Sequence, residues 1–194
     1  MTDRFTDAVS FAADLHRHQL RKGTGTPYIG HLLAVCAQVM EAGGTEDECI
    51  AALLHDAVED QGGAETAERI RTRFGPVVAR IVEGCSEGRG QGAGWAKRKR
   101  AAIRDAANAD RSVRLVLSAD KLHNARSLLT AHARLGADVW LRFKGGRTGT
   151  LWYMRSMADA IGRAGGSPLL AELRDAIGRL EALDAVCSSS PAEA

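Results

Sequence analysis

The run His55-Asp56-Ala57-Val58-Glu59-Asp60 gathers residue types that bind metal ions and transfer protons. We expect it to lie in the middle of one helix, 45–62, because a capping box begins that segment and glycine ends it. A spacing of four residues then puts the histidine above the glutamate and the first aspartate above the second. Apolar neighbours press this helix into the core, where three carboxylates and an imidazole repel one another unless a cation neutralises them. The pattern therefore indicates a divalent metal ion, the simplest such cation.

Two other positions strengthen this interpretation, since an isolated His-Asp pair on a helix is most often only a solvated polar pair. His31 lies near the start of the preceding predicted helix, and Asp120 lies in a polar island, 118–124, inside a long apolar segment. The alternatives are a surface histidine and a salt bridge from Asp120 to Lys121 or Arg126. An aspartate buried without a partner costs free energy that ligation to a metal ion removes. Two histidines and two aspartates suit Mn²⁺, Fe²⁺ or Zn²⁺, with coordination positions left open for water.

Composition and the spacing of apolar residues predict an all-α chain. The 194 residues are 45% hydrophobic and 5% aromatic with only 4 prolines, which favours packed helices over a β-sandwich. Segments with helical spacing, divided by glycine or proline, predict about eight to ten helices. We expect helices over 3–19, 26–42, 45–62, 64–74, 76–87, 95–109, 112–135, 150–163 and 168–186, with loops at 21–26, 87–94 and 144–149. We assign 1–186 to one domain and expect 187–194 to be a disordered tail.

The net charge and the cysteines restrict the classes of partner and compartment. A formal charge of +2 is too small for a protein that coats nucleic acid, so we expect no specific nucleic-acid partner. No apolar run approaches the roughly 18 residues that a membrane span needs. The 4 cysteines are scattered without a C-x-x-C pair, and nothing at the start resembles a secretion signal. We therefore expect reduced thiols and a cytoplasmic location, and we leave the oligomeric state open.

The order and spacing of these residues resemble the H…HD…D signature of the HD phosphohydrolases. Longer blocks resemble the hydrolase domain of the RelA/SpoT homologues over about residues 5–163. These blocks are Phe11-Ala12-Ala13 with His16, Arg21-Lys22, Thr26 to His31, Ala52 to Asp60, and Ala119 to Asn124. The resemblance implies an HD-domain helical bundle and a stand-alone small alarmone hydrolase. The implied reaction is manganese-dependent removal of the 3′-pyrophosphate from (p)ppGpp.

The same resemblance implies roles for individual residues. It assigns one Mn²⁺ per chain to the ligands His31, His55, Asp56 and Asp120. Glu59 and Asp60 match the family's acidic pair beside the metal, and Glu59 is the candidate to activate or orient the attacking water. The alternative for Glu59 is a hydrogen bond to a metal-binding histidine.

A third set of residues is expected to contact the nucleotide. These residues are Arg21, Lys22, Tyr28, Asn124, Lys97, Arg100, Trp152 and Tyr153. In the family the loop arginine packs over the base, which suits a planar guanidinium, and the tyrosine shapes the pocket. Lys97 and Arg100, which belong to a basic patch on the predicted helix 95–109, share a helical face and could hold phosphates. A solvated basic surface is the alternative both for the loop pair and for the patch.

The substrate is less defined than the metal site. The glycine-rich segment 87–94 and the segment 149–153 depart from the pattern of the long bifunctional enzymes. The expected partner is a small-molecule nucleotide, either (p)ppGpp or an adenosine alarmone such as (p)ppApp. An NADPH 2′-phosphatase or another HD nucleotide phosphohydrolase is the alternative, and a non-catalytic nucleotide-sensing module is the second. The acidic pair Glu59-Asp60 argues against the sensor, which would not need it.

Overall fold

The computed structural model describes residues 1–22, 25–86 and 94–183. Within them every regular element is a helix, apart from a single β-bridge between Leu20 and Pro27, so the predicted all-α class is confirmed. The elements are α1 (Asp3–Leu15), α2 (Ile29–Glu41), α3 (Glu46–Leu54), α4 (Ala57–Asp60), α5 (Gly63–Cys85), α6 (Trp95–Ala106), α7 (Arg111–Leu135), the 3₁₀ helix η1 (Gly136–Arg142), α8 (Gly146–Arg163) and α9 (Leu170–Ala182). The predictions for 187–194 and for most of 87–94 lie outside the described residues.

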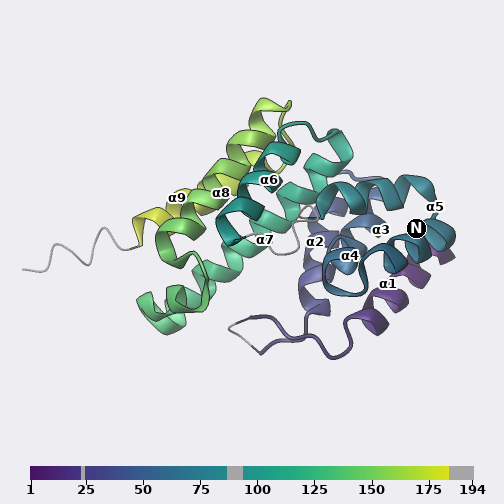
Figure 1. The fold of residues 1–194 in the computed structure, drawn as a ribbon, viewed down its shortest axis with the longest axis horizontal. Helices are drawn as coiled ribbons and strands as arrows, with labels where there is room; N and C mark the ends of the chain where they lie inside the picture. Colours follow the sequence, from purple (N-terminus) through teal and green to yellow (C-terminus); the bar gives the residue numbers. More distant parts are fainter. Residues whose placement is uncertain (23–24, 87–93, 184–194) are drawn as a thin grey trace, which may run out of the picture.

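Helix α7 lies at the centre of the molecule. It packs against α2, α3 and α5 on one side and against α6, α8 and α9 on the other (Figure 1). Its N-terminus is capped by Asp110, whose side chain accepts a hydrogen bond from the backbone N–H of Val113. Residues 115–120 are buried without interruption, as is typical of a helix enclosed on all sides. Asp120 is therefore carried into the interior by a helix that cannot turn it toward solvent.

The predicted capping box is present and begins α3. The Thr45 hydroxyl accepts from the N–H of Glu48 at 3.3 Å, and the Thr45 N–H donates to Glu48 Oε2 at 2.7 Å. Arg111, in the first turn of α7, lies 3.0 Å from Glu48 Oε1. Burial alone would raise the pKa of the Glu48 carboxyl, but hydrogen bonds from Thr45 and Ser112 and the charge of Arg111 hold it below its ordinary value. The box thus ties α3 to α7 as well as starting α3.

The prediction of one continuous helix over 45–62 is wrong. Helix α3 ends at Leu54 and α4 begins at Ala57, so the His-Asp pair lies in the break between them. The physical cause is local, because His55 Nδ1 makes a 2.8 Å hydrogen bond with the carbonyl of Ala52. In a continuing α-helix that carbonyl would accept from the N–H of Asp56. The side chain competes with the backbone for one acceptor, and the helix stops.

Other predicted boundaries also shift. Helix α2 begins at Ile29 rather than at 26. The Tyr28 N–H donates to the Gln19 carbonyl at 2.9 Å and Pro27 forms a β-bridge with Leu20, so residues 27 and 28 are held outside the helix. Helices α1 and α6 end earlier than expected, at Leu15 and Ala106, and α9 begins at Leu170. The expected helices 64–74 and 76–87 are the two halves of α5, which meet at Gly75 with φ 89°.

The turn predicted over 144–149 is largely helical, since α8 begins at Gly146. Two of its glycines, Gly145 and Gly149, allow close packing, while Gly146 has a positive φ of 57°. A Cβ added at Gly145 or Gly149 would lie 2.6 Å or 2.9 Å from ring atoms of Trp95. Trp95, the first residue of α6, therefore fixes that helix against the start of α8.

The described cysteines and helices bear on the expected state of the thiols and on the expected lack of a membrane span. Cys36, Cys49 and Cys85 are free, while Cys187 lies outside the described residues. None of the helices placed by the structure is long and apolar enough to cross a membrane. Buried apolar side chains from the α-helices and from η1 form one hydrophobic core, to which the short α4 contributes Ala57.

Substitution of the capping threonine tests whether the box stabilises the fold. We expect Thr45→Ala to lower the free energy of unfolding by about 1 kcal/mol, because the N–H of Glu48 loses its acceptor. Urea denaturation followed by circular dichroism measures the change. Thr72→Ala, at an exposed position inside α5, is the matched control and should change stability little. Equal effects of the two substitutions would contradict a stabilising cap.

Candidate metal centre and active site

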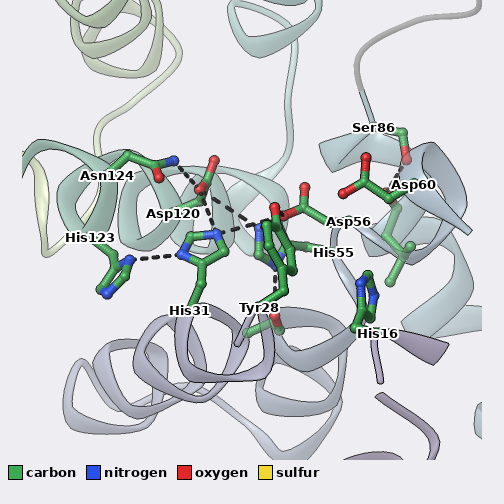
Figure 2. A network of polar contacts seen from close by, with 12 residues as sticks. His16, Tyr28, His31, His55, Asp56, Asp60, Ser86, Asp120, His123 and Asn124 are labelled. Atoms are coloured by element: carbon green, nitrogen blue, oxygen red, sulfur yellow. Dashed lines mark hydrogen bonds and ion pairs between the residues drawn. The ribbon is translucent and has the colours of Figure 1, made fainter. Parts of the chain in front are cut away.

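Three parts of the fold bring the four predicted ligands to one point (Figure 2). His31 comes from the first turn of α2, His55 and Asp56 from the break between α3 and α4, and Asp120 from α7. His55 Nε2 lies 3.0 Å from Asp56 Oδ2 and 3.7 Å from Asp120 Oδ1. His31 Nε2 lies 3.6 Å and 3.3 Å from the same two oxygens. Ligand atoms of His31, His55 and Asp56 all lie within 4.8 Å of one another.

The two imidazoles are oriented as metal ligands are. His31 is 2% exposed and His55 is 3% exposed. Their Nδ1 atoms are held by His123 Nδ1 at 2.7 Å and by the Ala52 carbonyl at 2.8 Å. Their Nε2 atoms are buried without a hydrogen bond and face the carboxylates. Buried polar atoms nearly always have a partner, so this nitrogen–oxygen donor set fits a divalent cation.

Electrostatics within the cluster is dominated by the opposite charges. Burial alone would lower the pKa of His55, but Asp56 and Asp120 raise it well above its ordinary value. Burial would raise the pKa of each aspartate, but His55 acting on Asp56, and Lys121 with both imidazoles acting on Asp120, hold these pKa values far below the usual range. The charges of the two carboxylates therefore favour a proton on His55. A metal ion must displace that proton to bind.

Neighbouring side chains orient the two carboxylates. The Tyr28 hydroxyl donates to Asp56 Oδ2 at 2.6 Å. Asn124 Nδ2 donates to Asp120 Oδ1 at 2.5 Å, and Lys121 Nζ donates to Asp120 Oδ2 at 2.6 Å. Burial and the charge of Asp56 raise the pKa of Tyr28 above its ordinary value, so its hydroxyl stays a neutral donor. Such contacts fix the direction in which ligand oxygens point.

The loop before α2 is connected to both carboxylates. Arg21 Nη2 donates to Asn124 Oδ1 at 2.9 Å, and the Arg21 guanidinium lies 5.9 Å from the centre of the Tyr28 ring. Asn124 binds one aspartate of the cluster and Tyr28 binds the other. Lys22 is exposed in the same loop. A ligand that moves Arg21 would therefore change the surroundings of both carboxylates.

Glu59 and Asp60 lie at the solvent side, on the short helix α4, where both are exposed. Asp60 lies on the Asp56 side of the cluster, and its Oδ2 accepts from Gln19 Nε2 at 2.7 Å (Figure 2). Gln19 Oε1 is in turn 2.7 Å from Gln61 Nε2 and 2.7 Å from Nδ1 of the buried His16. The amide of Gln19 is thereby oriented to donate to Asp60.

The predicted phosphate and pocket residues lie on α6 and α8. Arg100 lies 6.0 Å from the centre of the Trp152 ring, and Lys97 is exposed on the same helix. Tyr153 is contacted instead by Lys99, whose Nζ lies 4.4 Å from the ring centre. The structure thus brings Trp152 and Tyr153 against the basic helix, through Lys99 and Arg100.

Sequence reasoning gave no site role to His16, Gln19, Lys99 or His123. It named Lys121 only as the alternative salt-bridge partner of Asp120, and the structure shows that contact at 2.6 Å. Lys121 and His123 flank Asp120 inside the polar island, and that position was a usable signal. Which lysine of α6 faces α8 depends on how the two helices pack, and the sequence of α6 alone does not give it.

The comparisons with known proteins identify the class. The family model described as HD domain matches residues 8–151, and the chain belongs to this family. The resemblance to HD phosphohydrolases is thereby confirmed at the level of the family.

Particular relatives extend the comparison. The guanosine-3′,5′-bis(diphosphate) 3′-pyrophosphohydrolase MESH1 of Danio rerio is 41% identical over 125 residues, which cover 63% of this chain and 67% of the relative. A solved structure described as a metazoan ortholog of SpoT that hydrolyzes ppGpp superposes with a TM-score of 0.77 at 28% identity, covering 94% of this chain and 98% of that one. A structure of lmo0812 from Listeria monocytogenes EGD-e superposes with a TM-score of 0.69 at 28% identity, covering 81% and 99%.

Competition between a metal ion and the His55 proton predicts a pH dependence. The raised pKa of His55 stabilises the metal-free fold fully below about pH 6.5, and this contribution is lost as pH rises through the raised pKa. Stabilisation by a bound metal ion instead increases as pH rises, because the ion binds only the unprotonated His55. We therefore expect the difference in Tm between protein with MnCl₂ and protein with EDTA to grow from pH 6 to pH 8.5.

Two variants isolate the His55 contribution. His18→Gln, at an exposed histidine, should keep the growing difference, whereas His55→Gln should remove most of it. A difference in Tm that is constant over this pH range in the unmodified chain would contradict the coupling.

Proposed function

We propose that this chain is a metal-dependent phosphohydrolase that removes the 3′-pyrophosphate from (p)ppGpp or a related alarmone such as (p)ppApp. The products are the nucleoside 5′-di- or triphosphate and pyrophosphate. One observation carries the proposal: two buried imidazole Nε2 atoms without hydrogen bonds face Asp56 and Asp120. Membership of the HD domain family and similarity to relatives named as 3′-pyrophosphohydrolases support this substrate class.

The proposed ligands of one Mn²⁺ are His31, His55, Asp56 and Asp120. The same donors also suit Fe²⁺ or Zn²⁺. When bound, the ion lowers the pKa of a water molecule and neutralises phosphoryl oxygens. Tyr28 and Asn124 keep the two carboxylates pointed toward the imidazoles through the hydrogen bonds described above.

The acidic pair of α4 supplies the proton acceptor in this proposal. Water adds across the bond between the ribose 3′ oxygen and its phosphorus, so that the water oxygen joins the phosphorus and the 3′ oxygen leaves with a proton. Glu59 accepts a proton from the attacking water or orients it. Asp60 accepts a hydrogen bond from Gln19, which keeps its negative charge beside Asp56.

We assign nucleotide binding to residues of the loop before α2 and to residues of α6, α7 and α8. Arg21, with Lys22 and Tyr28 beside it, provides a planar cation for stacking on a base. The residues proposed to contact the rest of the nucleotide are Asn124, Lys97, Arg100, Trp152 and Tyr153. A cytoplasmic location and the absence of a specific nucleic-acid partner remain predictions, and one domain over 1–186 remains the proposed organisation.

Product analysis tests the proposed reaction. Purified protein with Mn²⁺ should release pyrophosphate from ppGpp or ppApp, and Asp56→Ala should abolish that release because the cluster loses a ligand. Chromatography of a panel of ppGpp, ppApp, NADPH and nucleoside monophosphates measures the products. Orthophosphate from NADPH or from a monophosphate would replace the proposed substrate, and tight nucleotide binding without turnover would favour a sensor.

A second experiment tests the proton acceptor. We expect Glu59→Gln to lower kcat by about 10²- to 10⁴-fold, with a much smaller change in KM, because the amide cannot accept the proton. Glu65→Gln, at an exposed glutamate early in α5, is the matched control and should keep the unmodified rate. A drop confined to KM would place Glu59 in substrate binding instead.

A further inference from the structure

His16 is a buried imidazole that belongs neither to the proposed ligands nor to the proposed nucleotide contacts. It is the C-cap of α1, is only 2% exposed, and lies on the same side of the cluster as Asp60 (Figure 2). Its Nδ1 lies 2.7 Å from Gln19 Oε1, and its Nε2 is buried without a hydrogen bond. Its ring is stacked on that of Tyr28, with ring centres 5.4 Å apart and an interplanar angle of 20°. His16 therefore reaches the site through Gln19 and through Tyr28.

We propose that His16 is a positioning residue, which through Gln19 fixes the carboxylate of Asp60 and thereby sets the rate of hydrolysis rather than the affinity for nucleotide or metal. The inference rests on the proposed function and deepens it, because it adds a residue outside the metal cluster on which turnover depends.

The hydrogen bonds of Gln19 can be assigned in only one way. An ionised carboxylate is only an acceptor, so the amide nitrogen of Gln19 must face Asp60 Oδ2, which lies 2.7 Å away. The amide oxygen then faces His16 Nδ1 and Gln61 Nε2, both at 2.7 Å, and both must donate to it. His16 carries its hydrogen on Nδ1, since a hydrogen on Nε2 would be a buried donor without an acceptor.

Asp60 depends on this chain of hydrogen bonds for a fixed position. It is exposed at the end of the short helix α4, where a free carboxylate rotates over a broad range. Gln19 reaches it from the loop before α2 but is itself only half-buried. If the amide of Gln19 turned over, its oxygen would face the carboxylate and its nitrogen would face two donors. The buried His16 is the least mobile of these groups, so it anchors the others.

Packing against Tyr28 is the competing explanation for a histidine at this position. The Tyr28 hydroxyl donates to Asp56 Oδ2 at 2.6 Å, so loss of the stacked ring would act on a proposed metal ligand instead of on Asp60. Two substitutions separate these explanations. Phenylalanine keeps a flat ring beside Tyr28 but removes the Nδ1 donor. Asparagine removes the ring but has a side-chain N–H that can replace the donor.

Steady-state kinetics of alarmone hydrolysis with Mn²⁺ is the first test. We expect His16→Phe to lower kcat about ten-fold and to leave KM within about two-fold, because Asp60 loses its fixed position while nucleotide contacts remain. His16→Asn should recover most of the lost kcat. His18→Phe, at an exposed histidine two residues away, is the matched control and should keep the unmodified kcat. Manganese affinity, measured by electron paramagnetic resonance, should be the same in all of these proteins.

Nuclear magnetic resonance of the Gln19 side-chain amide is a second test, which needs no turnover. The protein is ¹⁵N-labelled and loaded with Zn²⁺, which suits the same ligands and is diamagnetic. The absence of the signal in Gln19→Ala assigns it. We expect the order parameter of this amide to be high in the unmodified chain and in His16→Asn, and to fall below about 0.6 in His16→Phe.

The outcomes separate this inference from the proposed function. An unchanged kcat in His16→Phe, an ordered Gln19 amide in that variant, or an equal loss of kcat in His16→Phe and His16→Asn would overturn the inference. A chain that hydrolyses no alarmone, but in which only His16→Phe releases the Gln19 amide, keeps the positioning of Gln19 and rejects the proposed reaction.

A variant outside the core keeps the inference testable if His16→Phe does not fold, which thermal unfolding by circular dichroism checks. Gln19→Met removes the same connection at a half-buried position and should lower kcat to the same extent. A full kcat in Gln19→Met would show that Asp60 needs no support from this chain of hydrogen bonds.

Discussion

Side chains of two consecutive residues in a continuous α-helix do not face each other, yet the metal site needs two consecutive residues, His55 and Asp56. Successive side chains on an α-helix are turned about 100° apart. His55 and Asp56 nevertheless approach each other to 3.0 Å in the turn where the regular helix is interrupted between Leu54 and Ala57, although both residues keep right-handed backbone dihedrals. The His55 ring causes this by binding the Ala52 carbonyl through Nδ1, which leaves Nε2 toward the carboxylates. One contact thus ends a helix, orients an imidazole and brings its neighbour into the cluster.

The central helix α7 supplies the other half of the geometry. Its residues 115–120 are buried without interruption, so Asp120 has fixed neighbours: His31 from α2, Lys121 and Asn124 from its own turns. Charges at such depth are stable only when they are neutralised in place. The same helix therefore organises the core and holds the most buried carboxylate of the site. Stability of the core and integrity of the cluster depend on one element.

The parts that could be predicted from the sequence are those with local causes. A capping box involves residues three apart in the chain, so Thr45 and Glu48 marked the start of α3 correctly. Polar residues inside apolar segments stand out in any one helix, and the four members of the cluster lie together. The break at His55 was not predicted because it depends on the orientation of the His55 ring, which the sequence does not give. The start of α8 was not predicted because Trp95, far away in the chain, fills the space beside Gly145 and Gly149.

The contact between His31 and His123 constrains where hydrogen atoms reside. Two Nδ1 atoms at 2.7 Å can share only one hydrogen, so one ring donates and the other accepts. Burial and the nearby His31 lower the pKa of His123 to about 4, which keeps His123 neutral near pH 7. If His31 is the donor, its Nδ1 carries the hydrogen, its Nε2 keeps a lone pair toward the carboxylates, and His123 carries its own hydrogen on Nε2. The tautomers of a residue on α2 and a histidine on α7 are in this way linked, because the ring that donates determines where the other carries its hydrogen.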